Sequence, residues 1–255
     1  MSSSHDFVRD KRNENIKIYI NGRFYPRSKA NISVFDSGFL LGDGVWSGIR
    51  LHNQKLLFIK EHLKRLKDDA KQIGLKIHLS KKELEKAIYR TTNINKMKSD
   101  VHIRLVVSRG IKSTPYQDPA FTISKPTIVI IPEYKIPQEK TYKQGVKLTT
   151  VKTIRGPENV QDPKLNSLSK LNCILACIEA KNKKCDEALM KDPNRNIATC
   201  NSTHFSYIKN KKVFTSTGKY RVKGITRQNV INICKKNKIV VFQKNFKLSD
   251  VLRAD

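Results

Sequence analysis

Residues 34–50 read VFDSGFLLGDGVWSGIR, and three of the four glycines there, Gly38, Gly42 and Gly44, alternate with large apolar residues. Glycine adopts backbone angles that are closed to other residues, so a glycine-rich loop lets other groups approach its backbone closely. Loops on a rigid scaffold often carry function. The stretch therefore predicts a loop that a ligand or a partner subunit approaches.

The residues around this loop predict a small α+β domain over residues 1–133. IKIYINGRFYP, at 16–26, alternates apolar residues about Asn21-Gly22, which is typical of a type I′ hairpin. KLLFIKEHLKRLKDDAKQIGL predicts a short strand and then an amphipathic helix that ends near Gly74, and KKELEKAIYRTTN predicts a second helix. VHIRLVVSRG and PTIVIIPEY are expected to be buried strands.

The second half predicts a larger mixed α/β domain over residues 141–255, after a linker at 134–140 that contains Pro137. GVKLTTVKTI, DEALMKD and IVVFQKNF are expected strands, and HFSYIKNKKVFTS is an expected hairpin. Helices are expected after KGIT, at KLSDVLRAD and within PKLNSLSKLNCILACIEA, where four apolar residues recur at helical spacing: Leu171, Ile174, Leu175 and Ile178. The chain stops directly after LRAD, which favours a domain that is incomplete at its C-terminus.

Composition narrows the class of protein. The 255 residues carry 51 Lys and Arg against 22 Asp and Glu, a formal charge of +29. This charge is spread evenly and is not interleaved with aromatic residues, so specific nucleic-acid binding is not expected. Without a long apolar run or a signal-peptide core, the sequence favours a soluble, cytoplasmic protein. The five cysteines form no C-x-x-C pair, and no metal site is predicted.

Two motifs are candidate phosphate-binding elements. In KGITRQNV, Gly224 and Thr226 open a predicted helix with Thr226 as its N-cap, and free N–H groups at a helix start suit phosphate. In EHLKRL, Arg65 lies between apolar residues of an amphipathic helix, where its guanidinium can turn inward and bind a phosphate. Taken singly, each motif is better explained without a phosphate, as a plain capped helix and as a snorkelling surface arginine.

The series of motifs is more specific than any one of them. DSGFLLGDGVW, HLKRL, IRLVVSRG, LSKLNCILACIEA with DEAL, STHF and GITRQNV occur in this order from about Tyr19 to Asp255. The series resembles the class IV aminotransferases, which include branched-chain aminotransferases, D-amino-acid aminotransferases and aminodeoxychorismate lyases. The resemblance implies a two-domain α+β fold, pyridoxal 5′-phosphate as cofactor and a homodimer with the glycine-rich loop near the subunit interface.

The resemblance also implies which residues bind the cofactor phosphate. Arg65 matches the family arginine that pairs with it, and Gly224, Ile225 and Thr226 match the helix start that donates backbone N–H bonds to it.

The position of the covalent lysine departs from the family pattern. In the family, a lysine shortly before a helix ending in Glu-Ala holds the cofactor as an imine. A gapless count back from Glu179 places that lysine at Asn166. Lys164 lies two residues earlier and so has the same strand parity. We predict Lys164 as the catalytic lysine over Lys170, and the alternative that neither serves stays open.

Two further positions complete the predicted site. Thr199 is expected to face the pyridine nitrogen, where the family has a glutamate; a hydroxyl holds a proton there less well than a carboxylate. Arg104, in VHIRL, is a candidate for the substrate carboxylate and is equally well explained as structural.

The resemblance favours an aminotransferase that moves an amino group between an amino acid, branched-chain or similar, and a 2-oxo acid. A carbon–carbon lyase of the aminodeoxychorismate type and a non-catalytic relative that lacks the lysine are the alternatives.

Overall fold

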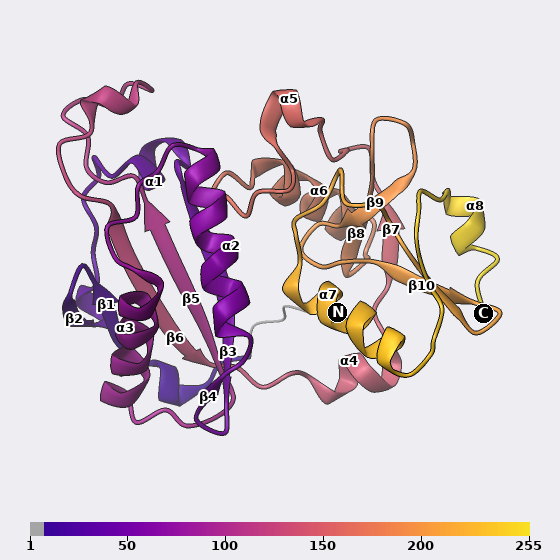
Figure 1. Cartoon of the computed structure of the whole chain (residues 1–255), viewed down its shortest axis with the longest axis horizontal. Coiled ribbons are helices and arrows are strands. Elements are labelled where there is room, and N and C mark those ends of the chain that lie inside the picture. The colour runs from indigo at the N-terminus through magenta and orange to yellow at the C-terminus, as the bar shows by residue number, and fades with distance from the viewer. Residues whose placement is uncertain (1–7) are drawn as a thin grey trace. The chain divides into compact units, whose positions relative to one another are not determined.

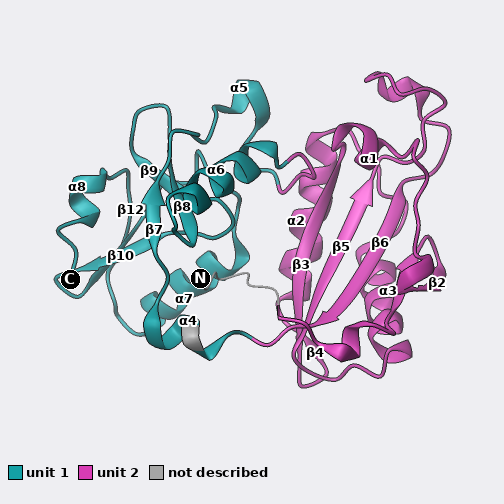
Figure 2. Cartoon of the chain, turned by 180° about the vertical axis from the view of Figure 1, so that it is seen from behind, with its two compact units in different colours: residues 1–6, 137–165, 170–255 teal, residues 7–136, 166–169 magenta. Residues whose placement is uncertain are grey.

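The computed structural model describes residues 8–255, which form two compact units (Figure 2). Of the described residues, one unit contains 8–136 together with 166–169, and we call it the N-terminal unit. The other contains residues 137–165 and 170–255, and we call it the C-terminal unit. The main division lies inside the linker predicted at 134–140. The return of 166–169 to the N-terminal unit was not predicted, and residues 1–7 of the predicted first domain lie outside the described part.

The N-terminal unit is a six-stranded sheet with two helices on one face (Figure 1). Its strand order is β2-β1-β6-β5-β3-β4, and every pairing is antiparallel. The strands are β1 (Lys17–Ile20), β2 (Arg23–Pro26), β3 (Gly44–His52), β4 (Lys55–Leu56), β5 (Val101–Ser108) and β6 (Thr127–Tyr134). Helices α2 (Ile59–Gln72) and α3 (Lys81–Ile94) cover the sheet, and short helices η1 (Lys11–Asn13), α1 (Ser37–Leu41), η2 (Arg27–Lys29) and η3 (Pro119–Phe121) lie in the connections.

Local chemistry explains these elements. Asn21 and Gly22 both have positive φ angles, 46° and 96°, as the predicted type I′ hairpin between β1 and β2 requires. Helix α2 buries Leu63 and Leu66 in the core, which lies between the helices and the sheet. Gly74 follows α2 with φ +64°, in agreement with the predicted end of that helix.

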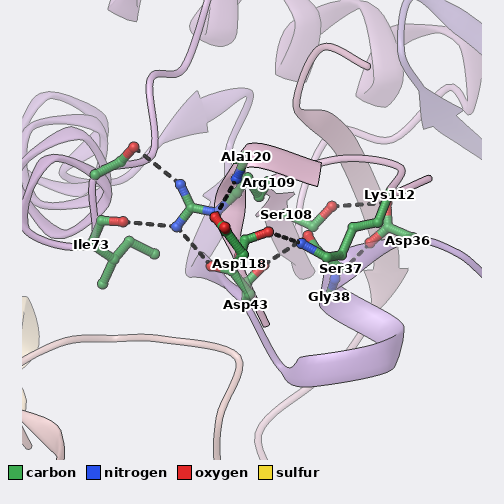
Figure 3. Close-up of polar contacts among 11 residues, drawn as sticks. Asp36, Ser37, Gly38, Asp43, Ile73, Ser108, Arg109, Lys112, Asp118 and Ala120 are labelled. Carbon is green, nitrogen blue, oxygen red and sulfur yellow. Dashed lines mark hydrogen bonds and ion pairs between the residues drawn. The ribbon is translucent and has the colours of Figure 1, made fainter. Parts of the chain in front are cut away.

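Polar contacts hold the glycine-rich loop in place (Figure 3). The Asp36 carboxylate accepts bonds from the Gly38 N–H at 2.8 Å and from the Ser108 hydroxyl at 2.9 Å. Arg109 binds Asp43 through two bonds of 2.6 and 3.0 Å. These contacts fix the loop at both ends of α1, so the start of β3 has a defined position.

Residues 166–169 extend the sheet of the N-terminal unit at the edge of β3. Trp46 N–H donates to the Asn166 carbonyl at 3.0 Å, and Leu168 N–H donates to the Gly44 carbonyl at 2.9 Å. Ser167 forms an antiparallel bridge with Val45. Strand β4 pairs only with Leu51 and His52 of β3. Residues 166–169 therefore form hydrogen bonds with backbone groups on the part of the β3 edge that β4 leaves unpaired.

The C-terminal unit contains two three-stranded sheets and five helices among its described residues (Figure 1). One sheet has the order β7-β8-β9 and the other β10-β11-β12. The strands are β7 (Leu148–Thr150), β8 (Glu187–Lys191), β9 (Ile197–Cys200), β10 (Ser206–Lys209), β11 (Lys212–Thr215) and β12 (Val241–Gln243). The helices are α4 (Glu139–Gln144), α5 (Glu158–Gln161), α6 (Leu171–Asn182), α7 (Ile225–Lys236) and α8 (Leu248–Val251).

Helix α6 packs with its small residues. Ala176 and Ala180 are fully buried against Val151, Ala188 and Met190. The four large apolar residues that marked this helix in the sequence are all exposed instead, between 46% and 67%: Leu171, Ile174, Leu175 and Ile178. Helix α6 therefore presents an apolar stripe to the surface.

Two sequence predictions need correction here. Thr226 is not the N-cap of α7, because the helix begins at Ile225 and Gly224, with φ −73° and ψ 124°, takes the cap position. The strands expected at 145–154 and 239–246 are only three residues long each, at 148–150 and 241–243. Among the described residues, no helix has both the length and the apolar character needed to cross a membrane.

Candidate functional site

A polar cluster lies under α2 in the N-terminal unit, on the face of the sheet that the helices cover. His62, Arg65 and Asp69 follow one another at spacings of three and four along α2, so they share one face of the helix. Arg65 Nη2 donates to the Ser47 hydroxyl at 3.2 Å, and Ser47 Oγ lies 2.8 Å from His62 Nδ1. Because arginine only donates, the Ser47 hydroxyl accepts from Arg65 and its proton is available to the histidine ring.

Burial sets the charges in this cluster. Burial, with a smaller contribution from the charge of Arg65, lowers the pKa of His62 to about 4, so the ring is neutral near pH 7. Burial also lowers the pKa of Arg65, and the Asp69 carboxylate partly opposes this shift. Asp69 itself is only 1% exposed. A desolvated guanidinium of this kind gains from any further anion that reaches it.

Asn166, the position to which the lysine count leads, belongs to this same cluster. Its side-chain amide donates to the Trp46 carbonyl at 2.8 Å, and its backbone N–H donates to Asp69 Oδ2 at 3.1 Å. The residue is 5% exposed. Asp69 thus links Arg65 and Asn166 within the N-terminal unit. Its charge acts on the guanidinium of Arg65, and its carboxylate accepts the backbone N–H of Asn166.

Lys164 lies in the C-terminal unit and forms ion pairs there. Its Nζ is 2.6 Å from Glu158 Oε2 and 3.7 Å from Asp162 Oδ2. The hydrogen bond to Glu158 and the charges of both carboxylates raise the pKa of Lys164. A lysine that bonds covalently to an aldehyde must lose its proton readily, so these surroundings oppose the predicted role. That role stays a prediction.

Lys170 is the residue before α6. Its carbonyl accepts the N–H groups of Cys173 at 2.9 Å and Ile174 at 3.0 Å, which start the helix. The backbone of Lys170 therefore forms the start of the helix.

The start of α7 is shaped by a histidine. The His204 ring packs so closely on Gly224 that a Cβ at this glycine would lie 1.8 Å from His204 Nε2. Only glycine fits this position without moving the ring. The N–H groups of Ile225 and Thr226 lie in the first turn, where a helix supplies no internal acceptor for them. This end of α7 can therefore receive an anion.

Lys164 is connected to this region through its backbone. The Lys164 carbonyl accepts the N–H of Lys223 at 3.4 Å, one residue before Gly224. Arg155 reinforces the same area: its guanidinium donates to the carbonyl of Pro163 at 2.9 Å and to that of Tyr220 at 3.4 Å. The C-terminal unit thus holds the segment before α6 beside the segment before α7.

Thr199 and Arg104 lie elsewhere in their units. Thr199, in β9, is 6% exposed and its hydroxyl donates to the Thr203 carbonyl at 2.7 Å. Arg104, in β5, places its guanidinium 3.9 Å from the centre of the Trp46 ring, and desolvation there lowers its pKa. Strand alternation puts Arg104 and Trp46 on the sheet face opposite to Ser47. The predicted contacts of Thr199 with a ring nitrogen and of Arg104 with a carboxylate stay predictions.

Sequence reasoning missed His62 and Asp69. Their signal was available, because they lie three residues before and four after Arg65 on an amphipathic helix. It did not reveal that Asn166 joins them, because that contact spans 97 residues of chain.

Comparisons with known proteins agree with this fold. The sequence model of the family "Amino-transferase class IV" matches residues 44–255. "Putative branched-chain-amino-acid aminotransferase" of Methanocaldococcus jannaschii is 36% identical over 94% of this chain and 82% of its own length. "Branched-chain-amino-acid aminotransferase-like protein 2" of Arabidopsis thaliana is 34% identical over 95% of this chain, which spans only 44% of that protein.

Solved structures show the same architecture. The branched-chain aminotransferase from the archaeon Thermoproteus uzoniensis, solved with norvaline, superposes with a TM-score of 0.83 at 26% identity, covering 94% of this chain and 81% of that one. Another branched-chain amino acid aminotransferase, complexed with N-(5′-phosphopyridoxyl)-L-glutamate, superposes with a TM-score of 0.86 at 25% identity, covering 94% of this chain and 80% of that one. The predicted α+β fold of the class IV type is therefore confirmed. On the family match and the Methanocaldococcus relative together, the chain belongs to the class IV aminotransferase family.

Proposed function

We propose that the chain is a pyridoxal 5′-phosphate-dependent aminotransferase that transfers an amino group between an amino acid, branched-chain or similar, and a 2-oxo acid. The observation that carries this proposal is the family match over residues 44–255, with relatives named for branched-chain amino acids. A related structure holds a phosphopyridoxyl derivative of glutamate, which supports both the cofactor and the substrate class.

The residues present fit the phosphate end of this cofactor. Within the N-terminal unit, the buried guanidinium of Arg65 suits an anion. Within the C-terminal unit, the first-turn N–H groups of Ile225 and Thr226 do so as well. The His204 ring packs closely on Gly224, the residue that caps α7. When bound, the cofactor supplies the electron sink for chemistry at the amino-acid α-carbon.

The residues present do not fit the covalent end of the cofactor. The gapless count in the sequence places the family lysine at Asn166, and the amine of Lys164 is paired with two carboxylates. No reaction step is therefore assigned to a lysine here.

Transfer of nitrogen tests the proposed function. The chain, loaded with pyridoxal 5′-phosphate, is mixed with 15N-labelled leucine, valine or alanine and with 2-oxoglutarate, and 15N in the glutamate is measured by mass spectrometry. We expect transfer that depends on the cofactor. Arg65→Lys keeps the charge beside Asp69 but loses the planar fork, and should weaken cofactor binding by about 1–2 kcal/mol. Absence of transfer with every donor, at full cofactor occupancy, would refute the aminotransferase activity.

We also propose that the functional form is a homodimer. The apolar stripe of α6 supports this, because four exposed Leu and Ile side chains on one helix face are typical of an interaction surface. The ten residues from Leu171 to Ala180 contain a single charged side chain, Glu179, in a chain that is otherwise rich in lysine. Charged residues are depleted in the centre of subunit interfaces.

A further inference from the structure

We propose that this chain binds pyridoxal 5′-phosphate without a covalent lysine, because Asn166 holds the strand position of that lysine as a structural residue. The inference rests on the proposed function, and it specifies how the cofactor is held.

Asn166 forms three hydrogen bonds where it lies. Its side-chain amide and its carbonyl both bond to the backbone of Trp46, and its N–H bonds to the Asp69 carboxylate. Two backbone bonds and one side-chain bond therefore connect this residue to β3 and α2. An asparagine side chain has no amine that condenses with an aldehyde, so this position provides no covalent link.

Leu168 fixes the register of the segment. Its Cδ1 occupies the space that side chains at Gly44 and Gly38 would fill, 2.7 and 3.1 Å from the Cβ positions of these glycines. Trp46 adds a bond from its indole N–H to the Ser167 carbonyl at 3.1 Å. Gly38 and Gly44 thus make room for Leu168, which is a packing reason for their presence.

A two-residue shift would be needed to bring Lys164 to the position of Asn166. That shift keeps the parity of the strand, but it moves Asn166 into the space now filled by Leu168. The polar amide would then lie against Gly44 and Gly38 and lose its bonds to Trp46, while the apolar contact of Leu168 would be lost. The observed register is therefore favoured over the one that Lys164 requires.

Lys164 forms ion pairs at another place in the structure. Its amine lies between Glu158 and Asp162, and both carboxylates would be left without this cation if the side chain moved away. The geometry of both residues points to a cofactor that is held by noncovalent contacts alone and that exchanges with free cofactor.

Reduction followed by peptide mapping tests this inference. The full chain is equilibrated with pyridoxal 5′-phosphate, and saturable binding is measured by dialysis and by the fluorescence of Trp46, which is the one tryptophan of the sequence. Borohydride is then added, the protein is unfolded and desalted, and the peptides are mapped by mass spectrometry. Pyridoxamine 5′-phosphate serves as competitor, which separates site labelling from chance labelling of surface lysines.

The outcomes separate the two proposals. We expect saturable binding with no stoichiometric, competable label on any lysine. Such a label on Lys164, Lys170 or another lysine would overturn this inference and leave the proposed function intact. Absence of saturable binding would overturn the proposed function, and the inference with it.

A gain of covalent binding tests the position itself. Asn166→Lys should acquire a stoichiometric label at residue 166, whereas Ser167→Lys, whose side chain leaves the strand on the other side, should not. Circular dichroism and Trp46 fluorescence verify that both variants are folded. A folded Asn166→Lys protein that binds cofactor and stays unlabelled would show that the position is misassigned. If Asn166→Lys does not fold, the peptide map of the reduced, unmodified chain still decides the proposal.

Discussion

At the scale of single residues, the protonation state of the cluster of Ser47, His62, Arg65 and Asp69 affects the stability of the N-terminal unit. A neutral histidine and a charged arginine share one hydroxyl in a buried place. The arrangement works only while the ring stays unprotonated, because a second positive charge beside Arg65 would be unpaired and partly desolvated.

Acid should therefore destabilise the protein through His62. The pKa of His62 is about 4 in the folded chain against about 6.5 when unfolded. As the pH falls from 6.5 to 4, the unfolded chain takes up this proton and the folded chain does not, so stability falls over that window by up to about 3 kcal/mol. Urea unfolding at pH 7 and pH 4.5 measures the loss.

His62→Gln should remove most of the difference in stability between pH 7 and pH 4.5, since glutamine does not titrate. His52→Gln, at an exposed position of β3, is the control and should keep it. An equal loss of stability in the His62→Gln variant and in the unmodified protein would contradict the assignment.

At the scale of elements, the start of α7 depends on the fit between His204 and Gly224. A methyl group at Gly224 would overlap the imidazole, so the ring or the helix start must move. We expect Gly224→Ala to lower the free energy of unfolding by about 1–3 kcal/mol, as for other overpacked sites. It should also weaken cofactor binding, because the N–H groups of Ile225 and Thr226 shift with the helix.

Gly156→Ala is the matched control in the same unit, because no atom lies within 4 Å of the added methyl group and its φ is not in the left-handed range. Chemical unfolding and cofactor titration compare the two variants. If Gly224→Ala were as stable as Gly156→Ala, the tight contact with His204 would be disproved.

At the scale of the whole molecule, the apolar stripe of α6 competes with a net charge of +29. Apolar contact favours association, while like charges oppose it and salt screens them. We expect a dimer that is strengthened by salt and that Leu175→Glu or Ile178→Glu converts to a monomer. Sedimentation velocity at low and high ionic strength measures both effects.

Lys181→Glu, an exposed substitution near the end of the same helix, controls for the change of charge and should leave the dimer intact. A monomeric unmodified chain at all salt concentrations would refute the homodimer. Dimerisation that survives both glutamate substitutions would show that another surface forms the interface.

The sequence by itself determined the local elements of this protein. Asn21-Gly22 specifies a hairpin because both residues accept positive φ, and helices α2 and α3 follow from apolar residues at the helical period. The order of short motifs also sufficed to identify the family, which the comparisons confirm. Arg65 and the start of α7 could be singled out as candidates because each is marked by a motif of only a few consecutive residues.

Only the tertiary structure decided what the residues around 164–170 do. Asn166 and Trp46 pair across 120 residues of chain, and Leu168 fits a space left by glycines more than 120 residues earlier. The cap of α7 depends on His204, and the exposed side of α6 depends on where Ala176 and Ala180 pack. Pairing and packing of this kind depend on which distant segments meet in space, and periodicity within one segment does not encode that.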